Sequence, residues 1–151
     1  MIPTSADFED LLETFDGYGV RALVIGGLAF TFHARPRYTK DLDIWVDPEP
    51  DNVAAANRAL AAFGSPFLLD PDRPDLILEL PVAPNRIDLI RQPGPLPFGE
   101  AWARRIPGRF GRAPAHWIAL EDLITLKSAI DDPRHQEDVR VLHKVLELRK
   151  K

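Results

Sequence analysis

Residues 24–47 constrain the fold of this chain more than any other stretch. Two short apolar runs rich in β-branched and aromatic residues, 23–25 and 42–46, predict two strands. A glycine pair, Gly26-Gly27, follows the first run, and a basic segment, residues 35–40, precedes the second. A strand, a glycine turn with a short helix, and a returning strand together predict a mixed α/β fold.

The second run opens with two aspartates, Asp41 and Asp43, separated by one apolar residue. Because side chains alternate along a strand, both carboxylates project from the same face. Adjacent like charges on a strand repel each other, so a cation is expected in front of them. A divalent metal ion, which prefers hard oxygen ligands, is the natural candidate.

Gly26 and Gly27 open a predicted short helix over residues 27–33. A glycine turn at a helix start exposes free backbone N–H groups, which makes it a ready phosphate site. The alternative is a tight turn that needs glycine for its conformation alone. His33 is interpreted as a residue of the helix end.

The string GGLAFTFHARPRYTKDLDI resembles the minimal bacterial nucleotidyltransferases of the polymerase-β-like superfamily, related to AbiE-type (abortive-infection) toxin nucleotidyltransferases. Their shared motif is a Gly-Gly or Gly-Ser turn followed by an Asp-x-Asp strand. The resemblance runs from about residue 20 to residue 146. It implies an α/β (α+β) nucleotidyltransferase fold in a single domain, residues 1–151, with a small mixed sheet over about 20–113 and C-terminal helices over about 120–150.

Asp88 is a candidate third carboxylate. It lies within the apolar run 86–90, a predicted strand, where an unpaired buried carboxylate would be costly. In the resembling family the third acid of the metal site lies on such a later strand. The alternative is an ion pair with Arg86 or Arg91. Glu79, on the predicted strand 76–80, is the rival third acid and is otherwise an outward residue.

The basic lead-in to the aspartates offers further candidates. If the strand begins early, Arg37 and Thr39 share a face with Asp41 and Asp43 and could contact a triphosphate. Otherwise the segment is a solvated loop. Lys40 has the opposite parity and is expected at the surface.

The C-terminal region predicts a helix over residues 120–130, followed by a last helix near Pro133 whose apolar stripe spans 138–150. The resemblance makes Lys127 a candidate phosphate contact and Asp138 a supporting residue. Alternatively, Lys127 is a lysine whose stem packs on an apolar helix. The acidic pair Asp131-Asp132 departs from the basic loop common in the family.

The remaining segments predict covering elements: helices over 4–18 and 48–63, a short helix or turn within 93–105, and a strand or loop over 108–114. The densest basic cluster is either a solvated face or a surface for RNA or an acidic protein; it contains Arg104, Arg105, Arg109 and Arg112. Trp102 and Trp117 are interpreted as exposed aromatic residues that would allow a dimer.

Composition excludes several classes of protein. The 151 residues contain no cysteine, which excludes disulfides and thiolate metal sites. The net charge of −4 means that a polynucleotide partner would need a local basic patch. No apolar run approaches the roughly 20 residues of a membrane span, and residues 1–10 lack a signal-like start. We therefore expect a cytoplasmic protein with no membrane partner.

The resemblance implies transfer of a nucleoside monophosphate from an NTP to an acceptor hydroxyl, with Mg²⁺ or Mn²⁺ as cofactor and release of pyrophosphate. The implied acceptor is tRNA or a partner protein in a toxin–antitoxin system, or else a small-molecule antibiotic. Two further alternatives are a non-catalytic transferase-fold binding module and a metal-dependent phosphoesterase. The phosphoesterase is disfavoured because the histidines are not clustered.

Overall fold

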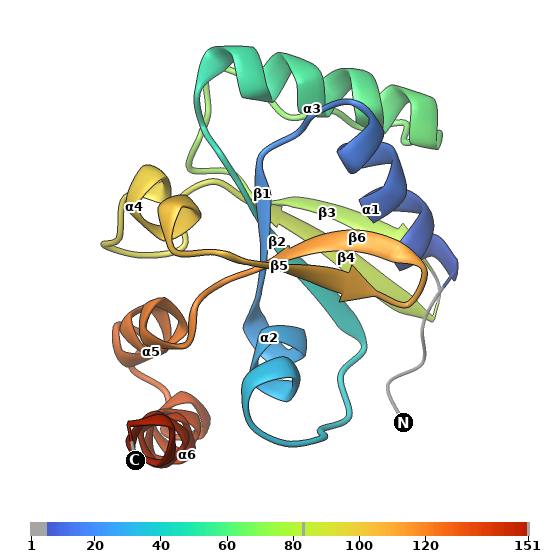
Figure 1. Cartoon of the computed structure of the whole chain (residues 1–151). Helices are drawn as coiled ribbons and strands as arrows, with labels where there is room; N and C mark the ends of the chain where they lie inside the picture. Colours follow the sequence, from blue (N-terminus) through green and yellow to red (C-terminus); the bar gives the residue numbers. More distant parts are fainter. Residues whose placement is uncertain (1–5, 83, 151) are drawn as a thin grey trace.

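The computed structural model describes residues 6–82 and 84–150 of the chain (Figure 1). Six strands form one mixed sheet in the order β3-β4-β2-β1-β6-β5. The strands are β1 (Ala22–Ile25), β2 (Asp41–Val46), β3 (Leu78–Val82), β4 (Asn85–Ile90), β5 (Ile106–Phe110) and β6 (Ala113–Trp117). The mixed sheet with flanking helices confirms the predicted α/β architecture.

Helices pack around this sheet: α1 (Ala6–Gly17), α2 (Gly26–His33), α3 (Pro50–Phe63), α4 (Phe98–Ala103), α5 (Leu120–Ser128) and α6 (Pro133–Arg149). Figure 1 shows α1 and α3 together at one side of the molecule, with α2, α5 and α6 at the other. Among the described residues, no helix combines the length and apolar character needed to cross a membrane.

The sheet register separates an apolar face from a charged one. Leu42 of β2 pairs with Ile87 of β4, Ile87 pairs with Leu80 of β3, and all three side chains are buried. One residue further along, Asp43, Asp88 and Glu79 form the neighbouring row. Because side chains alternate along strands, this acidic row projects from the opposite face.

The predicted strand or loop over 108–114 is in fact a turn between two antiparallel strands, β5 and β6. Gly111 makes the turn in a left-handed conformation, with φ of +57°. The backbone N–H of Arg112 then donates to buried Glu9 of α1 over 2.8 Å. The hairpin is thereby fixed to the first helix.

The expectation that Trp117 is exposed is wrong. Its side chain is 4% exposed, because the ring stacks on Phe32 of α2 with centroids 4.4 Å apart. Trp102 is half-buried, stacked on Phe98 and in edge contact with His116. The two tryptophans therefore belong to internal packing, and the dimer suggested by their exposure loses that support.

The last helix starts at Pro133, and the acidic pair before it has a structural function. Asp132 caps α6 by accepting a hydrogen bond from the Arg134 backbone N–H over 2.8 Å. Asp132 also pairs with the Arg134 guanidinium. A negative side chain at this end of a helix is favoured by the helix dipole and the free N–H groups.

Three arginines of the predicted basic cluster are engaged within the fold. Arg104 pairs with buried Asp122 over 2.9 Å, and the Arg105 guanidinium lies over the Trp102 ring. Arg109 donates to the Arg112 carbonyl. Much of the hydrogen-bonding capacity of these arginines is therefore used in contacts within the protein and is not free to bind a partner.

Candidate active site

The carboxyl groups of Asp43 and Asp88 lie side by side at the centre of the charged face. They are direct partners in the parallel pairing of β2 with β4, which places the two side chains next to each other on one face of the sheet. Asp88 is 9% exposed. Two carboxyl groups this close are stable together when they share a proton or face a cation.

This proximity perturbs the titration of Asp43. Burial, followed by the nearby charge of Asp88, raises the pKa of Asp43 to about 7. The carboxylate of Asp41 adds to the increase, whereas the Arg86 guanidinium opposes it. Strongly perturbed carboxyl groups that converge on one point are typical of functional sites.

Arg86 partly neutralises the acidic cluster. Its Nε lies 2.8 Å from Asp88 Oδ1, and its Nη2 lies 3.3 Å from Asp41 Oδ2. The ion pair with Arg86, which was the alternative interpretation of Asp88, is therefore present beside the carboxyl pair. Arg91, the other proposed partner, instead donates to backbone carbonyls of Asp70 and Arg73.

The donor chemistry of the cluster suits a magnesium or manganese ion. Within residues 6–82 and 84–150, no three His, Asp or Glu side chains converge in a metal-binding arrangement. Asp43 and Asp88 converge because they are direct strand partners. The Arg86 guanidinium binds both oxygens of Asp88 as well as Asp41, so an ion at the pair would share Asp88 with Arg86. Mg²⁺ is commonly held by one or two carboxylates together with substrate phosphates and water, so this pair fits such an ion.

The glycine turn lies directly against the carboxyl pair. Gly26 has φ of +70°, and a Cβ atom at this position would overlap the Asp43 carboxylate. A Cβ at Gly27 would lie 3.2 Å from Thr39 Oγ1. Helix α2 begins here without a side-chain cap, so no capping side chain occupies the N–H groups of its first turn. The structure thus brings together Gly26, Gly27, Thr39 and Asp43.

We expect Gly26→Ala to destabilise the protein by roughly 2–4 kcal/mol, because it combines a left-handed backbone with overlap on Asp43. Gly64→Ala is the matched control. Gly64 also has a positive φ, +98°, but a Cβ there meets nothing within 4 Å, so about 1–2 kcal/mol is expected. Urea unfolding of both variants measures the difference, and equal losses would show that Asp43 does not crowd the turn.

Arg37, Lys127 and Asp138 form a separate, buried ion cluster. Lys127 Nζ lies 3.0 Å from Asp138 Oδ2, with both side chains 5% exposed. The Arg37 guanidinium also binds Asp138, through both of its terminal nitrogens, and lies over the Phe30 ring. Burial alone would raise the pKa of Asp138, but these two cations hold it below its usual value.

This cluster changes the interpretation of the basic candidates. The strand begins at Asp41, so Arg37 does not share a strand face with the aspartates but reaches across to α6. Lys127 is directed at Asp138, as a supporting ion pair would require. Lys40 is exposed, as expected, and Glu79 lies exposed on edge strand β3.

A cavity of about 260 Å³ opens beside Gly26 and Asp43. Its other walls are largely apolar and come from the sheet and from the C-terminal helices; they include Ile25, Ile77, Ile90, Pro93, Leu123, Leu126 and Ile130. His135 of α6 also lines the cavity. The cavity thus combines apolar walls with the carboxyl group of Asp43, the imidazole of His135 and the amide of Gln92.

His135 is a site residue that the sequence reasoning missed. Its Nδ1 lies 3.5 Å from Lys127 Nζ, and because an ammonium group only donates, Nδ1 accepts. The neutral ring then carries its proton on Nε2. Burial, together with the charge of Lys127, lowers the pKa of His135 and favours this neutral form. The sequence did carry one indication of this role. His135 is three residues before Asp138 in α6, and residues three apart lie on the same face of a helix.

His33, by contrast, has a structural role. It is the last residue of α2 and is buried, with its Nε2 2.6 Å from the Ile118 carbonyl oxygen. That carbonyl is an acceptor, so Nε2 carries the proton and Nδ1 faces Arg149. His33 joins α2 to the segment before α5, as its interpretation as a helix-end residue allows.

Comparisons with known proteins identify the fold. No family model matches the sequence, and no curated protein matches it. The structure is similar to the crystal structure of the aminoglycoside nucleotidyltransferase ANT(2″)-Ia in complex with adenylyl-2″-tobramycin. The TM-score is 0.60 at 14% sequence identity, over 95% of this chain and 89% of that one. The chain therefore has a nucleotidyltransferase fold.

Proposed function

We propose that this protein is a metal-dependent nucleotidyltransferase that moves a nucleoside monophosphate from an NTP to an acceptor hydroxyl and releases pyrophosphate. The observation that carries the proposal is the Asp43–Asp88 carboxyl pair held against the Gly26 turn, within a nucleotidyltransferase fold. A paired, perturbed acid beside free backbone N–H groups can hold a metal–triphosphate group.

Each residue has a distinct role in this proposal. Asp43 and Asp88 would hold the Mg²⁺ or Mn²⁺ ion, with Asp41 adding negative charge from beside Arg86. When bound, such an ion neutralises charge on the transferring phosphoryl group and lowers the pKa of a bound hydroxyl. Backbone N–H groups at Gly26 and Gly27 bind phosphate oxygens. The Thr39 hydroxyl adds a polar contact close to Gly27.

The proton and the supporting contacts follow from the same geometry. The acceptor hydroxyl gives its proton to a carboxylate oxygen of Asp88, which acts as general base. Lys127 and Arg37 are bound to Asp138, so they act by holding α6 and its neighbour His135 against the cavity. The apolar walls of the cavity suit the base of the nucleotide, and His135 Nε2–H donates to it.

We expect His135→Ala to weaken NTP binding about five- to tenfold, the value of one hydrogen bond, without a large loss of stability. Calorimetric titration of the folded variant measures the dissociation constant. Arg140→Ala is the matched control, because Arg140 is exposed on the same helix and pairs only with Glu137 among the described residues. Unchanged binding by His135→Ala would remove this residue from the nucleotide site.

Metal and nucleotide binding test the site itself. We expect calorimetry to detect binding of a non-hydrolysable NTP analogue in Mg²⁺ or Mn²⁺ and to lose it in EDTA. Asp88→Asn should bind the NTP analogue weakly both with metal and in EDTA. Nucleotide binding that needs metal, but without any transfer, would favour the alternative of a non-catalytic binding module. If neither metal-dependent nucleotide binding nor transfer is detected, the proposal is contradicted.

The acceptor is proposed from three classes: a tRNA end, a partner protein of a toxin–antitoxin system, or a small-molecule antibiotic. The ANT(2″)-Ia structure, a complex with adenylyl-2″-tobramycin, supports the antibiotic class. Incubation with each α-labelled NTP and total RNA, cell lysate protein, or an aminoglycoside panel separates the three. Label on RNA, on a protein band or on the antibiotic would each name one acceptor class.

A further inference from the structure

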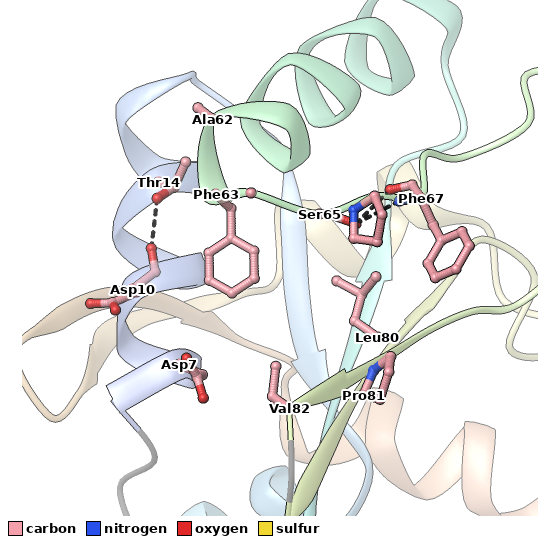
Figure 2. Close-up of a pocket in the computed structure, with 12 residues that line it drawn as sticks. Asp7, Asp10, Thr14, Ala62, Phe63, Ser65, Phe67, Leu80, Pro81 and Val82 are labelled. Carbon is pink, nitrogen blue, oxygen red and sulfur yellow. Dashed lines mark hydrogen bonds between the residues drawn. The ribbon is translucent and has the colours of Figure 1, made fainter.

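A second hollow, larger than the one beside Asp43, lies between α1, the end of α3 and β3 (Figure 2). Its volume is about 520 Å³, within the range of small-molecule sites. Figure 2 shows Phe63 directed between Asp10 of α1 and Val82 of β3. The proposed nucleotidyl transfer assigns no role to this groove.

The groove opens on the opposite face of the sheet from the carboxyl pair. Its floor residue Leu80 lies in the apolar row with Ile87 and Leu42. Asp43 and Asp88 project from the other face, because they are one residue out of step with that row. A molecule in the groove is therefore separated from the candidate active site by the sheet.

The walls of the groove divide into an apolar and an acidic side. Phe63, Phe67, Leu80 and Val82 supply the apolar side, and Phe67 remains 54% exposed. The turn that carries Phe67 is fixed by Ser65, whose hydroxyl bonds both the N–H and the carbonyl of Phe67. An exposed aromatic side chain held on a fixed turn can receive a flat or aliphatic group without large reordering.

The acidic side comes from α1. Asp10 is exposed at the rim, and its carboxylate has no partner within the described part of the chain. Asp7 lies one turn earlier and lines the same groove. The arginines and lysines of the described residues contribute nothing to the lining. The rim therefore attracts cations and repels phosphates or carboxylates.

We propose that this groove binds a small organic cation that carries an apolar body. Its ammonium group lies beside Asp10, and its body lies against Phe63 and Phe67. The aromatic faces add to the attraction, because a cation close to a ring is stabilised by the ring's charge distribution. A neutral or anionic molecule of the same shape gains only the apolar contact.

Three probes with the same phenyl group and three-carbon chain test this directly: 3-phenylpropylammonium, 3-phenylpropan-1-ol and 3-phenylpropionate. We expect the full-length protein at low ionic strength to bind the cation most tightly and the anion least. Calorimetry measures affinity, and amide shifts in ¹H–¹⁵N spectra locate the site. The shifts should map to α1, residues 62–67 and β3, and added salt should weaken binding of the cation alone.

Variants separate charge from packing. Asp10→Asn should weaken binding of the cation about fivefold, the upper value for an exposed ion pair, and leave the alcohol unchanged. Phe67→Ser, at a half-exposed position, should weaken both the cation and the alcohol. Glu13→Gln, exposed on α1 but outside the groove, is the matched control. Equal affinity for all three probes, shifts outside the groove, or no effect of Asp10→Asn would each overturn the proposal.

Discussion

Asp43→Asn should abolish nucleotidyl transfer while leaving the protein folded. Asparagine keeps the size of the side chain but removes the negative charge that a metal–triphosphate group needs. Loss of several kcal/mol of transition-state stabilisation corresponds to a decrease of about 10³-fold or more. Label transfer from an α-labelled NTP, measured under conditions where both proteins are folded, gives the ratio.

The same substitution should stabilise the metal-free protein at high pH. The pKa of Asp43 is about 7 in the folded state against an ordinary value of 3.8, so the folded state binds more protons between these values. Wild-type stability therefore falls as pH rises through this window and stays low above it. Asp43→Asn does not lose stability in this way. In EDTA at pH 8, its free energy of unfolding should therefore exceed that of the wild type by roughly 2–4 kcal/mol, a range that allows for solvent screening of the carboxyl pair.

Glu79→Gln is the control for both measurements. Glu79 lies in the same row of the sheet but is exposed at the edge strand, so neither activity nor stability should change appreciably. Loss of transfer in Glu79→Gln with retained transfer in Asp43→Asn would move the metal site toward β3. A wild-type stability that does not fall between pH 5 and 8 in EDTA would contradict the close carboxyl pair.

Asp138→Ala should be the most destabilising substitution away from the carboxyl pair. Asp138 is 3% exposed and neutralises both Lys127 and Arg37. Removal of Asp138 leaves the buried ammonium group of Lys127 without a negatively charged partner, which typically costs about 3–5 kcal/mol. Urea unfolding at constant pH measures the loss, and an unchanged m-value would show that two-state unfolding is retained.

Two further variants test whether the loss of stability comes from an unpaired buried charge. Lys127→Met combined with Asp138→Leu should recover part of the stability, because the buried ammonium group is removed together with its carboxylate. Arg37 also loses its carboxylate partner in this variant, but its side chain is 35% exposed and reaches water. Glu137→Ala, on the exposed side of α6, should change stability by less than about 0.5 kcal/mol. A loss of under about 1 kcal/mol in Asp138→Ala would show that Lys127 reaches solvent or another partner.

The predictable part of the site is its local geometry. Alternation along β2 was enough to place Asp41 and Asp43 on one face and Leu42 in the core, as the register shows. The glycine turn and the start of α2 also followed from local signals. The pairing of Asp43 with Asp88 could not be derived in this way, because these residues are 45 positions apart in the sequence and the register between their strands is set by packing of the whole sheet.

The missed features have equally specific causes. Pro107 and Pro114 lie within β5 and β6, and proline is a signal against strands, which hid the hairpin. Arg37 was assigned by strand parity to the phosphate side, but the strand starts four residues later and Asp138 attracts the guanidinium. Burial of Trp117 depends on a partner, Phe32, that lies on a distant helix.

The most direct test of the proposed function is metal-dependent transfer by the wild type beside Asp43→Asn. Purified protein is incubated with α-labelled NTPs and the pooled acceptors, in Mg²⁺, in Mn²⁺ and in EDTA, and both labelled acceptor and pyrophosphate are measured. We predict equal amounts of label and pyrophosphate from the wild type with metal, and neither from Asp43→Asn or in EDTA. Transfer that persists in Asp43→Asn, or in EDTA, would contradict a reaction centred on the Asp43–Asp88 pair.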